Sequence, residues 1–274
     1  MTHTSSGPYA LGHSDSELAR LATQARLIDP ITRRFFLEAG IAPGMRVLDV
    51  GSGAGDVALL VAGLVGNAGE VLGADRVSVA VGTANARVRA AALANVSFHV
   101  GDPAEMTFDR PFDAIVGRYV LMFQGDPVQM LHKLVAHLRP GGVIVFHEPD
   151  WDGVRSFPSV PTYDRCCAWL VQTLRLSGAD PRLGAKLHST FIAAGLPAPT
   201  MRLESVIAGG ANGSDQVHFK TDLARTLVSE MERLGVATRE EVQPNTLAER
   251  IQAEMAATQS IVVGRAEIGA WSHK

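Results

Sequence analysis

Short apolar runs alternate with amphipathic segments along the first half of the chain. Five runs have the length of buried strands, at 46–50, 70–74, 96–100, 114–116 and 143–147. Apolar residues at helical spacing fill the segments between them, at 56–66, 77–93, 104–108 and 127–138. Strands that alternate with helices in this way predict a parallel sheet with helices on both of its faces.

A further helix is predicted ahead of the first strand. Ser14 and Glu17 have the spacing of a capping box at a helix start. Apolar side chains then recur every three or four residues, at Leu18, Leu21, Ala25 and Ile28. Pro30 is expected to kink or restart this helix, and Gly40 to cap its end.

The pattern changes after Asp150. Helices are predicted over 161–177, 182–194, 215–234 and 239–257, and strands over 200–207 and 260–271. No internal repeat and no linker rich in Pro, Gly or Ser divides the chain. The sequence therefore predicts one domain over 1–274, with a core at 14–150 and a helical segment at 152–258 that is interleaved with the last strands.

Composition and charge narrow the class of protein. The 274 residues are 46% hydrophobic with a formal net charge of -3, which excludes overall disorder. No basic run is present, and the pI of 6.3 argues against a nucleic-acid partner. The longest apolar run, 57–62, is far shorter than the roughly 20 residues that span a bilayer. Without a secretion signal at the start, and with Cys166 and Cys167 adjacent and expected to stay reduced, we expect a cytoplasmic protein with no membrane partner.

The most informative segment is a glycine-rich loop after the first predicted strand. Residues 47–56 read VLDVGSGAGD, with glycines at Gly51, Gly53 and Gly55. Missing side chains let a ligand approach the backbone, and the following helix start offers free N–H groups. Asp56 stands where a dinucleotide-binding loop needs its third glycine, and the loop lacks the lysine of a P-loop. Asp49 and Asp56 also oppose a pyrophosphate, so a ligand with a cationic end and a ribose fits better than a phosphate ligand.

Acidic residues end the second and third predicted strands. Asp75 can accept two hydrogen bonds from a ribose diol at the end of its strand. Asp102 can accept a hydrogen bond from an exocyclic amine such as that of adenine. Each acid alone is explained equally well as a helix N-cap. The combination of both acids with the glycine loop predicts a nucleoside site.

Together these motifs resemble those of the class I S-adenosylmethionine-dependent methyltransferases, in particular their small-molecule branch. VLDVGSGAG is similar to the family's first motif, GADR to its second and GDPAEM to its third. FDAIVGRYVLMF and LRPGGVIVFHEPDW resemble its fourth-strand and fifth-strand segments. The resemblance covers residues 17–151 and implies an α/β fold. This fold is a Rossmann-like, doubly wound, mostly parallel sheet of about seven strands, with an N-terminal lid helix and a helical insertion over the active site.

The resemblance also implies S-adenosylmethionine as cofactor and S-adenosylhomocysteine as its product. The glycine loop would carry the methionine end with Asp49 close to its ammonium, Asp75 would hold the ribose and Asp102 the adenine. Arg20 or Gln24 of the lid helix would contact the carboxylate of the cofactor, although a solvated helix face explains both residues equally well. The full set implied to bind the cofactor is Asp49, Gly51, Ser52, Gly53, Gly55, Asp75, Arg76, Asp102, Pro103, Ala104, Arg118 and Gln24.

Polar and aromatic residues follow the fifth predicted strand. In an open α/β sheet the ligand crevice lies beyond the carboxyl ends of the strands, so the segment 147–151 is expected to face the acceptor. Glu148 and His147 are the predicted catalytic residues, as acceptor contact or base, with a structural histidine as the alternative for His147. The residues expected to bind the acceptor, with ordinary packing as the alternative for the first two, are Tyr119, Phe123, Asp150 and Trp151.

The resulting hypothesis is an enzyme that moves a methyl group by in-line displacement to O, N or C of a small organic acceptor, natural products included. Methyl transfer needs positioning of the nucleophile about 3 Å from the methyl, and a base only where the acceptor starts protonated. No cluster has metal-binding spacing, so no metal is expected, and a homodimer is compatible with the sequence. The alternative is a protein of this fold that binds the cofactor but catalyses cyclisation or decarboxylation, or only binds.

Overall fold

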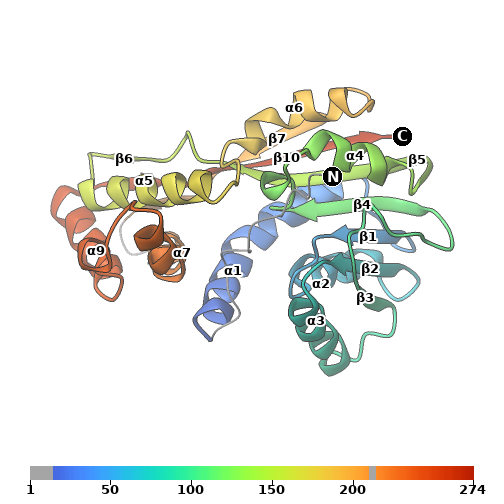
Figure 1. Ribbon diagram of the computed structural model, residues 1–274, viewed down its shortest axis with the longest axis horizontal. Helices are drawn as coiled ribbons and strands as arrows, with labels where there is room; N and C mark the ends of the chain where they lie inside the picture. Colours follow the sequence, from blue (N-terminus) through green and yellow to red (C-terminus); the bar gives the residue numbers. More distant parts are fainter. Residues whose placement is uncertain (1–14, 210–213) are drawn as a thin grey trace. The chain divides into compact units, whose positions relative to one another are not determined.

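The computed structural model describes residues 15–209 and 214–274, with side chains described for 27–209 and 215–274 (Figure 1). The chain forms two compact units, each assembled from separate segments. The unit called here the sheet unit consists of Asp29–Glu148, Leu183–Leu203 and Glu267–Lys274. The other, called the helical unit, consists of Met1–Ile28, Pro149–Arg182 and Glu204–Ala266.

The sheet unit is built on seven strands in the order β3-β2-β1-β4-β5-β10-β7. Their bounds are β1 Arg46–Val50, β2 Glu70–Asp75, β3 Val96–Val100, β4 Phe112–Arg118, β5 Leu138–Asp150, β7 Thr200–Glu204 and β10 Ala266–His273. Strands β1 to β5 pair in parallel, with Leu48 in register with Leu72 on one side and Ile115 on the other. The strand order reverses between β1 and β4, so the loops after these two strands diverge and leave the usual place for a ligand. The predicted fold class is confirmed.

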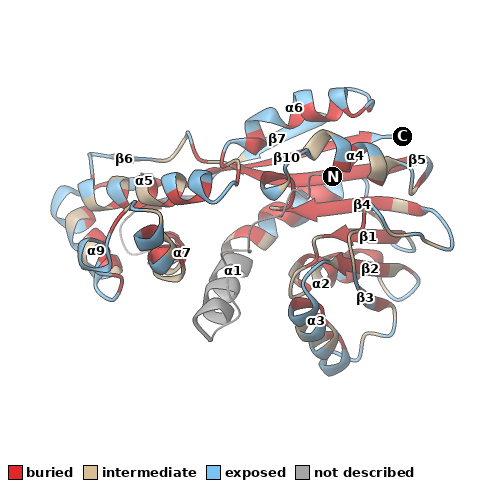
Figure 2. Ribbon diagram, in the orientation of Figure 1, coloured by how far each residue is buried: buried red, intermediate tan, exposed pale blue. Residues whose placement is uncertain are grey.

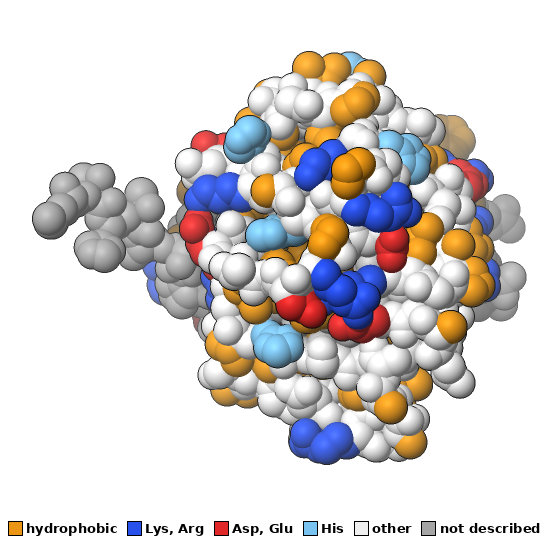
Figure 3. Space-filling view, turned by 90° about the vertical axis from the view of Figure 1, so that its right-hand side faces the viewer, with side chains coloured by type: hydrophobic (Ala, Val, Ile, Leu, Met, Phe, Trp, Pro, Cys, Tyr) orange, Lys and Arg blue, Asp and Glu red, His pale blue; other side chains and the backbone are white. Residues whose placement is uncertain are grey.

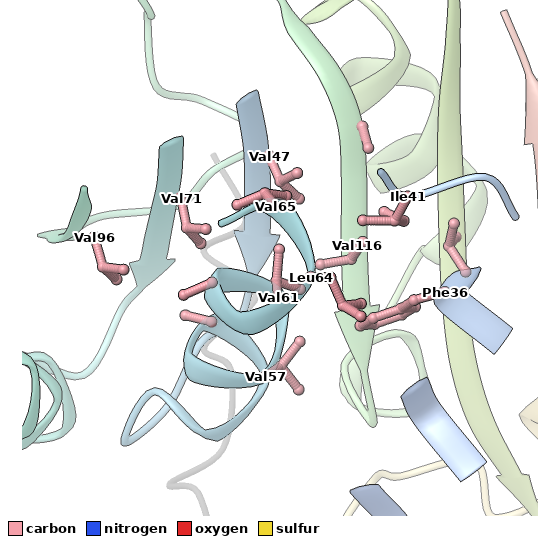
Figure 4. Packing of buried hydrophobic residues seen from close by; sticks show 14 of the residues in the cluster. Phe36, Ile41, Val47, Val57, Val61, Leu64, Val65, Val71, Val96 and Val116 are labelled. Carbon is pink, nitrogen blue, oxygen red and sulfur yellow. The ribbon is translucent and has the colours of Figure 1, made fainter. Parts of the chain in front are cut away.

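Helices cover both faces of this sheet (Figures 1 and 2). The helices are α1 Asp15–Glu38, of which the part from Asp29 onward belongs to this unit, α2 Asp56–Val65, α3 Ser78–Ala90, the 3-10 turn η1 Leu121–Phe123, α4 Pro127–Val135 and α6 Leu183–Ala193. Figure 4 shows Val57, Val61 and Leu64 of α2 packed toward Val47 and Val116 of the sheet. All five residues of β1 are buried, as expected for a parallel strand covered on both faces.

The amino ends of the strands carry alternating charges. Arg46 at the start of β1 forms ion pairs with Glu70 and Asp109, and Arg139 forms one with Asp113. Figure 3 shows this side of the molecule, where Lys and Arg side chains lie beside Asp and Glu side chains. The charges on this edge are therefore largely matched by one another.

The helical unit packs α7 against α5 and α9. Its elements are α5 Pro161–Leu176, α7 Ser214–Arg233, α8 Arg239–Val242, α9 Leu247–Thr258, and the three strands β6 Arg155–Phe157, β8 Ile207–Gly209 and β9 Ile261–Val263. The three strands form a small antiparallel sheet in the order β6-β9-β8. Cys166 and Cys167 are buried free thiols on α5. Burial raises the pKa of both thiols, that of Cys167 to about 11.

Several predicted elements differ in the structure. The helix predicted over 104–108 is absent: residues 103–105 form a turn and 106–108 have no regular secondary structure. The Asp102 side chain accepts a hydrogen bond from the Ala104 N–H (3.0 Å) in this turn. The predicted helix 239–257 is divided into α8 and α9 at a segment that contains Pro244. The predicted strands 200–207 and 260–271 are each divided in two. Helix α1 continues through Pro30 without a break in its assignment.

Candidate active site

The glycine loop joins β1 to α2 at the carboxyl edge of the sheet unit. Gly51, Gly53 and Gly55 have φ values of 63°, 51° and 90°, in the left-handed region that side chains disfavour. Space is also limited, because a Cβ on Gly51 would lie 2.7 Å from a Val120 methyl and one on Gly55 would lie 2.9 Å from the Phe98 ring. Both the backbone conformation and the packing therefore require glycine at positions 51 and 55.

Asp49 lies at the carboxyl end of β1 with 1% of its surface exposed. Neither carboxylate oxygen has a hydrogen-bond partner of normal geometry. Desolvation raises the pKa of Asp49 well above its ordinary range, and the Arg118 charge and the Ala58 backbone N–H offset only part of that shift. A buried carboxylate without partners is costly to a protein. The hydroxyl of Ser52 in the glycine loop is also buried without a partner, so this end of β1 holds two polar groups that a ligand could satisfy.

Two further acids stand at the ends of β2 and β3. Asp75 accepts hydrogen bonds from the N–H groups of Gly53 (2.9 Å) and Val77 (2.8 Å), one on each oxygen. It therefore ties the glycine loop to the start of α3, and each oxygen keeps a lone pair for a further donor. Asp102 forms an ion pair with Arg76 (2.5 Å) in addition to its bond with Ala104. The structure thus brings the predicted residues of these three strand ends to adjacent strands of one sheet.

Arg118, at the end of β4, points into the interior. Its side chain is 3% exposed and contacts Asp29 (2.6 Å) and Thr32 Oγ1 (3.0 Å), both on α1. The guanidinium is thus held by protein groups in this structure, while its charge still acts on Asp49. Gln24 and Arg20, the other residues expected at the methionine end, lie in the part of α1 whose side chains are outside the described residues.

His147 on β5 is at the centre of a buried polar network. It is fully buried, its Nε2 lies 3.0 Å from Glu267 Oε2, and its Nδ1 lies 3.1 Å from Thr32 Oγ1. The Tyr119 hydroxyl donates to the same Glu267 oxygen at 2.6 Å. This network connects β5, β10, α1 and the residue after β4. Glu267 and Thr32 belong to no sequence motif, although an acidic residue in the apolar run 261–271 was a visible signal for Glu267.

Glu148, the next residue of β5, is fully buried and accepts hydrogen bonds from three consecutive backbone N–H groups. The donors are Val120 (2.8 Å), Leu121 (2.7 Å) and Met122 (3.3 Å). These are the groups that open η1, so the Glu148 carboxylate fixes the chain as it leaves β4. In this geometry Glu148 acts on the backbone of a neighbouring loop. Its predicted contact with an acceptor stays a prediction.

The residues expected to bind the acceptor are divided between the two units. Tyr119 has a φ of 57° and uses its hydroxyl on Glu267, and Phe123 is 38% exposed. Trp151 is 3% exposed in the helical unit, and its indole Nε1 is buried without a hydrogen-bond partner. Asp150 accepts a hydrogen bond from the Asp152 N–H. The role of these four residues in acceptor binding stays a prediction.

Among the side chains of 27–209 and 215–274, no group of three or more His, Cys, Asp or Glu has the arrangement of a metal site. None of the helices in these ranges combines the length and apolar content needed to cross a membrane.

Comparison with known proteins places this geometry in a family. The model of the family described as "Methyltransferase domain" matches residues 41–186, which is more than half of the chain. The 2-phytyl-1,4-naphtoquinone methyltransferase of Synechococcus elongatus is 37% identical over 123 residues, covering 43% of this chain and 53% of that protein. The arsenite methyltransferase of Aquipseudomonas alcaligenes is 35% identical over 130 residues, covering 43% of this chain and 38% of that protein. The chain therefore spans about half the length of these curated relatives, or less.

A solved structure supports the same fold. A phosphoethanolamine N-methyltransferase from Haemonchus contortus, in complex with phosphomonomethylethanolamine and S-adenosylhomocysteine, superposes with a TM-score of 0.55 at 15% identity. The match covers 94% of this chain and 52% of that one. At this identity the likeness concerns the fold alone. With the family model spanning the glycine loop and the acids of β1, β2 and β3, the chain belongs to the class I S-adenosylmethionine-dependent methyltransferase family, in the branch whose relatives are named for small-molecule acceptors.

Proposed function

We propose that this chain binds S-adenosylmethionine at the carboxyl ends of β1, β2 and β3 and transfers its methyl group to a small organic acceptor. The observation that carries the proposal is Asp49, a buried acid on β1 just before the glycine loop. Neither of its carboxyl oxygens has a hydrogen-bond partner of normal geometry, and the three glycines of the loop have left-handed φ values. A ligand with a positive charge would favour the ionised form of this carboxyl group and compensate its negative charge. The ammonium and sulfonium of S-adenosylmethionine have that chemistry.

The neighbouring acids fit the rest of this cofactor. Asp75 keeps a lone pair on each oxygen, as binding of a ribose diol requires, while its present bonds hold the glycine loop in position. Asp102 and the turn through Pro103 and Ala104 lie at the end of β3, the next strand along. When bound, the cofactor supplies an electrophilic methyl group on sulfur, and the protein residues bind, orient and exclude water.

We propose that the residues at the carboxyl ends of β4 and β5 form a rigid support beside the acceptor. Glu148 fixes the turn after β4, and Glu267 contacts both His147 Nε2 and the Tyr119 hydroxyl. Positioning of a nucleophile near an activated methyl can contribute about 7–11 kcal/mol to a barrier reduction, so this scaffold is sufficient for an acceptor that needs no deprotonation. Both ring nitrogens of the buried His147 are engaged, one with Glu267 and one with Thr32, so its role as a base for an acceptor that starts protonated stays a prediction.

The acceptor is proposed as a small organic molecule methylated on O, N or C. The curated relatives are named for a naphthoquinone and for arsenite, and both match this chain over only 43% of its length. The acceptors of these relatives differ in size and chemistry. Their shared segment therefore supports the cofactor more strongly than any one acceptor.

Calorimetric titration of the purified chain tests the proposal, with S-adenosylmethionine and S-adenosylhomocysteine as ligands and NADH as control. We expect binding of the first two and none of NADH. Formation of S-adenosylhomocysteine with a panel of phenols, amines and activated carbon acids then separates methyl transfer from binding alone or from another reaction. No heat with either sulfur nucleoside would overturn the proposal, and binding with no turnover across the panel would favour the non-transferring alternative.

A further inference from the structure

Two side chains from the neighbouring strand and helix hold the glycine loop of the sheet unit. Asp75, at the end of β2, accepts a hydrogen bond from the Gly53 N–H (2.9 Å). Arg87, in the last turn of α3, donates through Nη1 to the Ala54 carbonyl (2.6 Å). Gly53 and Gly55, on either side of Ala54, have left-handed φ values of 51° and 90°. Arg87 therefore contacts the loop at the residue between two glycines.

The same nitrogen of Arg87 forms an ion pair with Asp56, the first residue of α2. The two charged groups are 2.8 Å apart, and their side chains are 39% and 18% exposed. An acid in the first turn of a helix is already stabilised by the helix dipole, so Asp56 does not depend on Arg87 for its place. The effect of Arg87 therefore falls on the loop and on the charge beside it.

A loop rich in glycine binds a ligand tightly only if it is ordered beforehand. Glycine loses more conformational freedom on ordering than any other residue, and a loop that becomes ordered during binding subtracts that entropy from the affinity. The hydrogen bond from Arg87 to the Ala54 carbonyl is present in the ligand-free protein. Arg87 thus fixes the loop before a ligand arrives.

Arg87 also changes the charge that surrounds Asp49. Burial is the main cause that raises the pKa of Asp49, and the charges of Asp75 and Asp56 add to this shift. The Arg118 charge opposes it. Because the ion pair with Arg87 offsets part of the Asp56 charge, removal of Arg87 would raise the pKa of Asp49 further. Ionisation of Asp49, which a cationic ligand favours, would then need a higher pH.

We propose that Arg87 is a positioning residue of the cofactor site. It holds the glycine loop in the conformation that receives the methionine end of the cofactor, and it reduces the negative charge that Asp56 exerts on Asp49. This inference rests on the proposed function, because the cofactor is the ligand that the loop would receive. Arg87 acts through the Ala54 carbonyl and the Asp56 carboxylate rather than on the reacting atoms.

Hydrogen exchange of the ligand-free protein, followed by mass spectrometry, tests the effect on the loop. Arg87→Met keeps an unbranched side chain and removes the hydrogen bond and the charge, so we expect peptides covering 51–59 to exchange faster. Arg89→Met is the matched control, because Arg89 is an exposed arginine of the same helix turn, and it should leave this exchange unchanged. Unchanged exchange over 51–59 in Arg87→Met would overturn the inference. Faster exchange throughout the protein would also overturn it, because that result indicates a general loss of stability.

Calorimetric titration with two sulfur nucleosides tests the effect on the ligand. S-adenosylhomocysteine carries the amino-acid end of the cofactor, whereas 5′-methylthioadenosine has the same nucleoside without that end. We expect Arg87→Met to weaken S-adenosylhomocysteine at least about tenfold and to change 5′-methylthioadenosine by less than about twofold. Arg87→Lys keeps the positive charge, so it should recover part of the affinity, and it serves if Arg87→Met does not fold. Equal weakening of both nucleosides would overturn the inference.

The pH dependence of S-adenosylhomocysteine binding tests the electrostatic part. In the wild type, affinity should increase as pH rises and Asp49 ionises, and in Arg87→Met this increase should occur at higher pH. Arg87→Lys should follow the wild-type profile. An unshifted profile in Arg87→Met would overturn the role that we assign to the Arg87 charge. The two proposals fail separately: a wild type that binds neither nucleoside overturns the proposed function and this inference with it, whereas wild-type affinity in Arg87→Met overturns this inference alone.

Discussion

Two buried acids at the carboxyl edge of the same sheet have opposite surroundings. Asp49 at the end of β1 has no hydrogen-bond partner for either oxygen, whereas Glu148 near the end of β5 accepts from three backbone N–H groups. Both side chains are almost completely inaccessible, at 1% and 0% exposure. Burial alone therefore does not distinguish a ligand-binding acid from a structural one.

The difference extends to the neighbours of each acid. Around Asp49 lie left-handed glycines and a Ser52 hydroxyl without a partner. Around Glu148 lies a network in which His147 and Tyr119 both bond to Glu267. The β1 side of the edge thus leaves polar groups open for a ligand, and the β5 side satisfies its polar groups internally. We infer that the β1 side of the sheet edge binds a ligand and that the β5 side stabilises the structure around it.

Replacing Glu148 should have the largest effect on stability. Glu148→Ala leaves three buried backbone N–H groups without an acceptor, and we expect the free energy of unfolding to fall by about 3 kcal/mol or more. Urea denaturation followed by circular dichroism measures this change. Glu148→Gln, which keeps a carbonyl oxygen for two of the donors, should cost less. A stable Glu148→Ala protein with reduced cofactor affinity would place Glu148 in the cofactor site and remove the contrast with Asp49.

Replacing Asp75 tests the ligand-binding role that we infer for the β1 side of the sheet edge. Asp75→Ala removes the proposed acceptor for the ribose hydroxyls, and we expect the affinity for S-adenosylmethionine to fall at least tenfold, since each hydrogen bond to a charge contributes about 1.5–3 kcal/mol. Calorimetry gives the dissociation constant directly. Because Asp75 also holds the Gly53 and Val77 N–H groups, Asp75→Asn is the control that retains one acceptor oxygen. An unchanged dissociation constant in Asp75→Ala would show that the ribose lies elsewhere.

The ionisation of Asp49 should have the smallest and most specific effect, a pH dependence of cofactor binding. In the free protein the pKa of this residue is raised by desolvation, so the protonated form stabilises the fold, and that contribution is lost as pH rises through the raised value. A cationic ligand favours the ionised form, so binding should release up to one proton and affinity should increase with pH over the same window. Calorimetry in two buffers of different ionisation enthalpy counts the protons. Asp49→Asn should release none, and an equal release in that variant would assign the proton to another group.

The strand and loop pattern of the cofactor half was predictable because its signals are local. Runs such as 46–50 and 70–74, each followed by glycine or an acid, determine both the parallel sheet and the position of Asp49 and Asp75. Local signals failed at 104–108, where the predicted helix is replaced by a turn at 103–105 and a segment without regular structure. Pro244 likewise divides a segment whose apolar periodicity alone reads as one helix.

The polar network at β5 was not predictable, because its members are distant in sequence. Thr32, His147 and Glu267 meet only after α1 and β10 have packed beside β5. The sequence indicated that His147 and Glu148 lie at a strand end, and it gave no sign of the backbone donors that hold Glu148. Likewise, Arg87 is 33 positions from Ala54 and reaches its carbonyl only in the folded sheet unit.

The close approach of Gly51 to Val120 has an evolutionary consequence. A Cβ at position 51 would lie 2.7 Å from the Val120 methyl, and the Val120 N–H is in turn bonded to Glu148 at 2.8 Å. We therefore expect substitutions at positions 51 and 120 to be coupled, because any side chain at position 51 would contact the branched side chain at 120. The glycine loop and the segment after β4 are thus expected to vary together among related chains rather than independently.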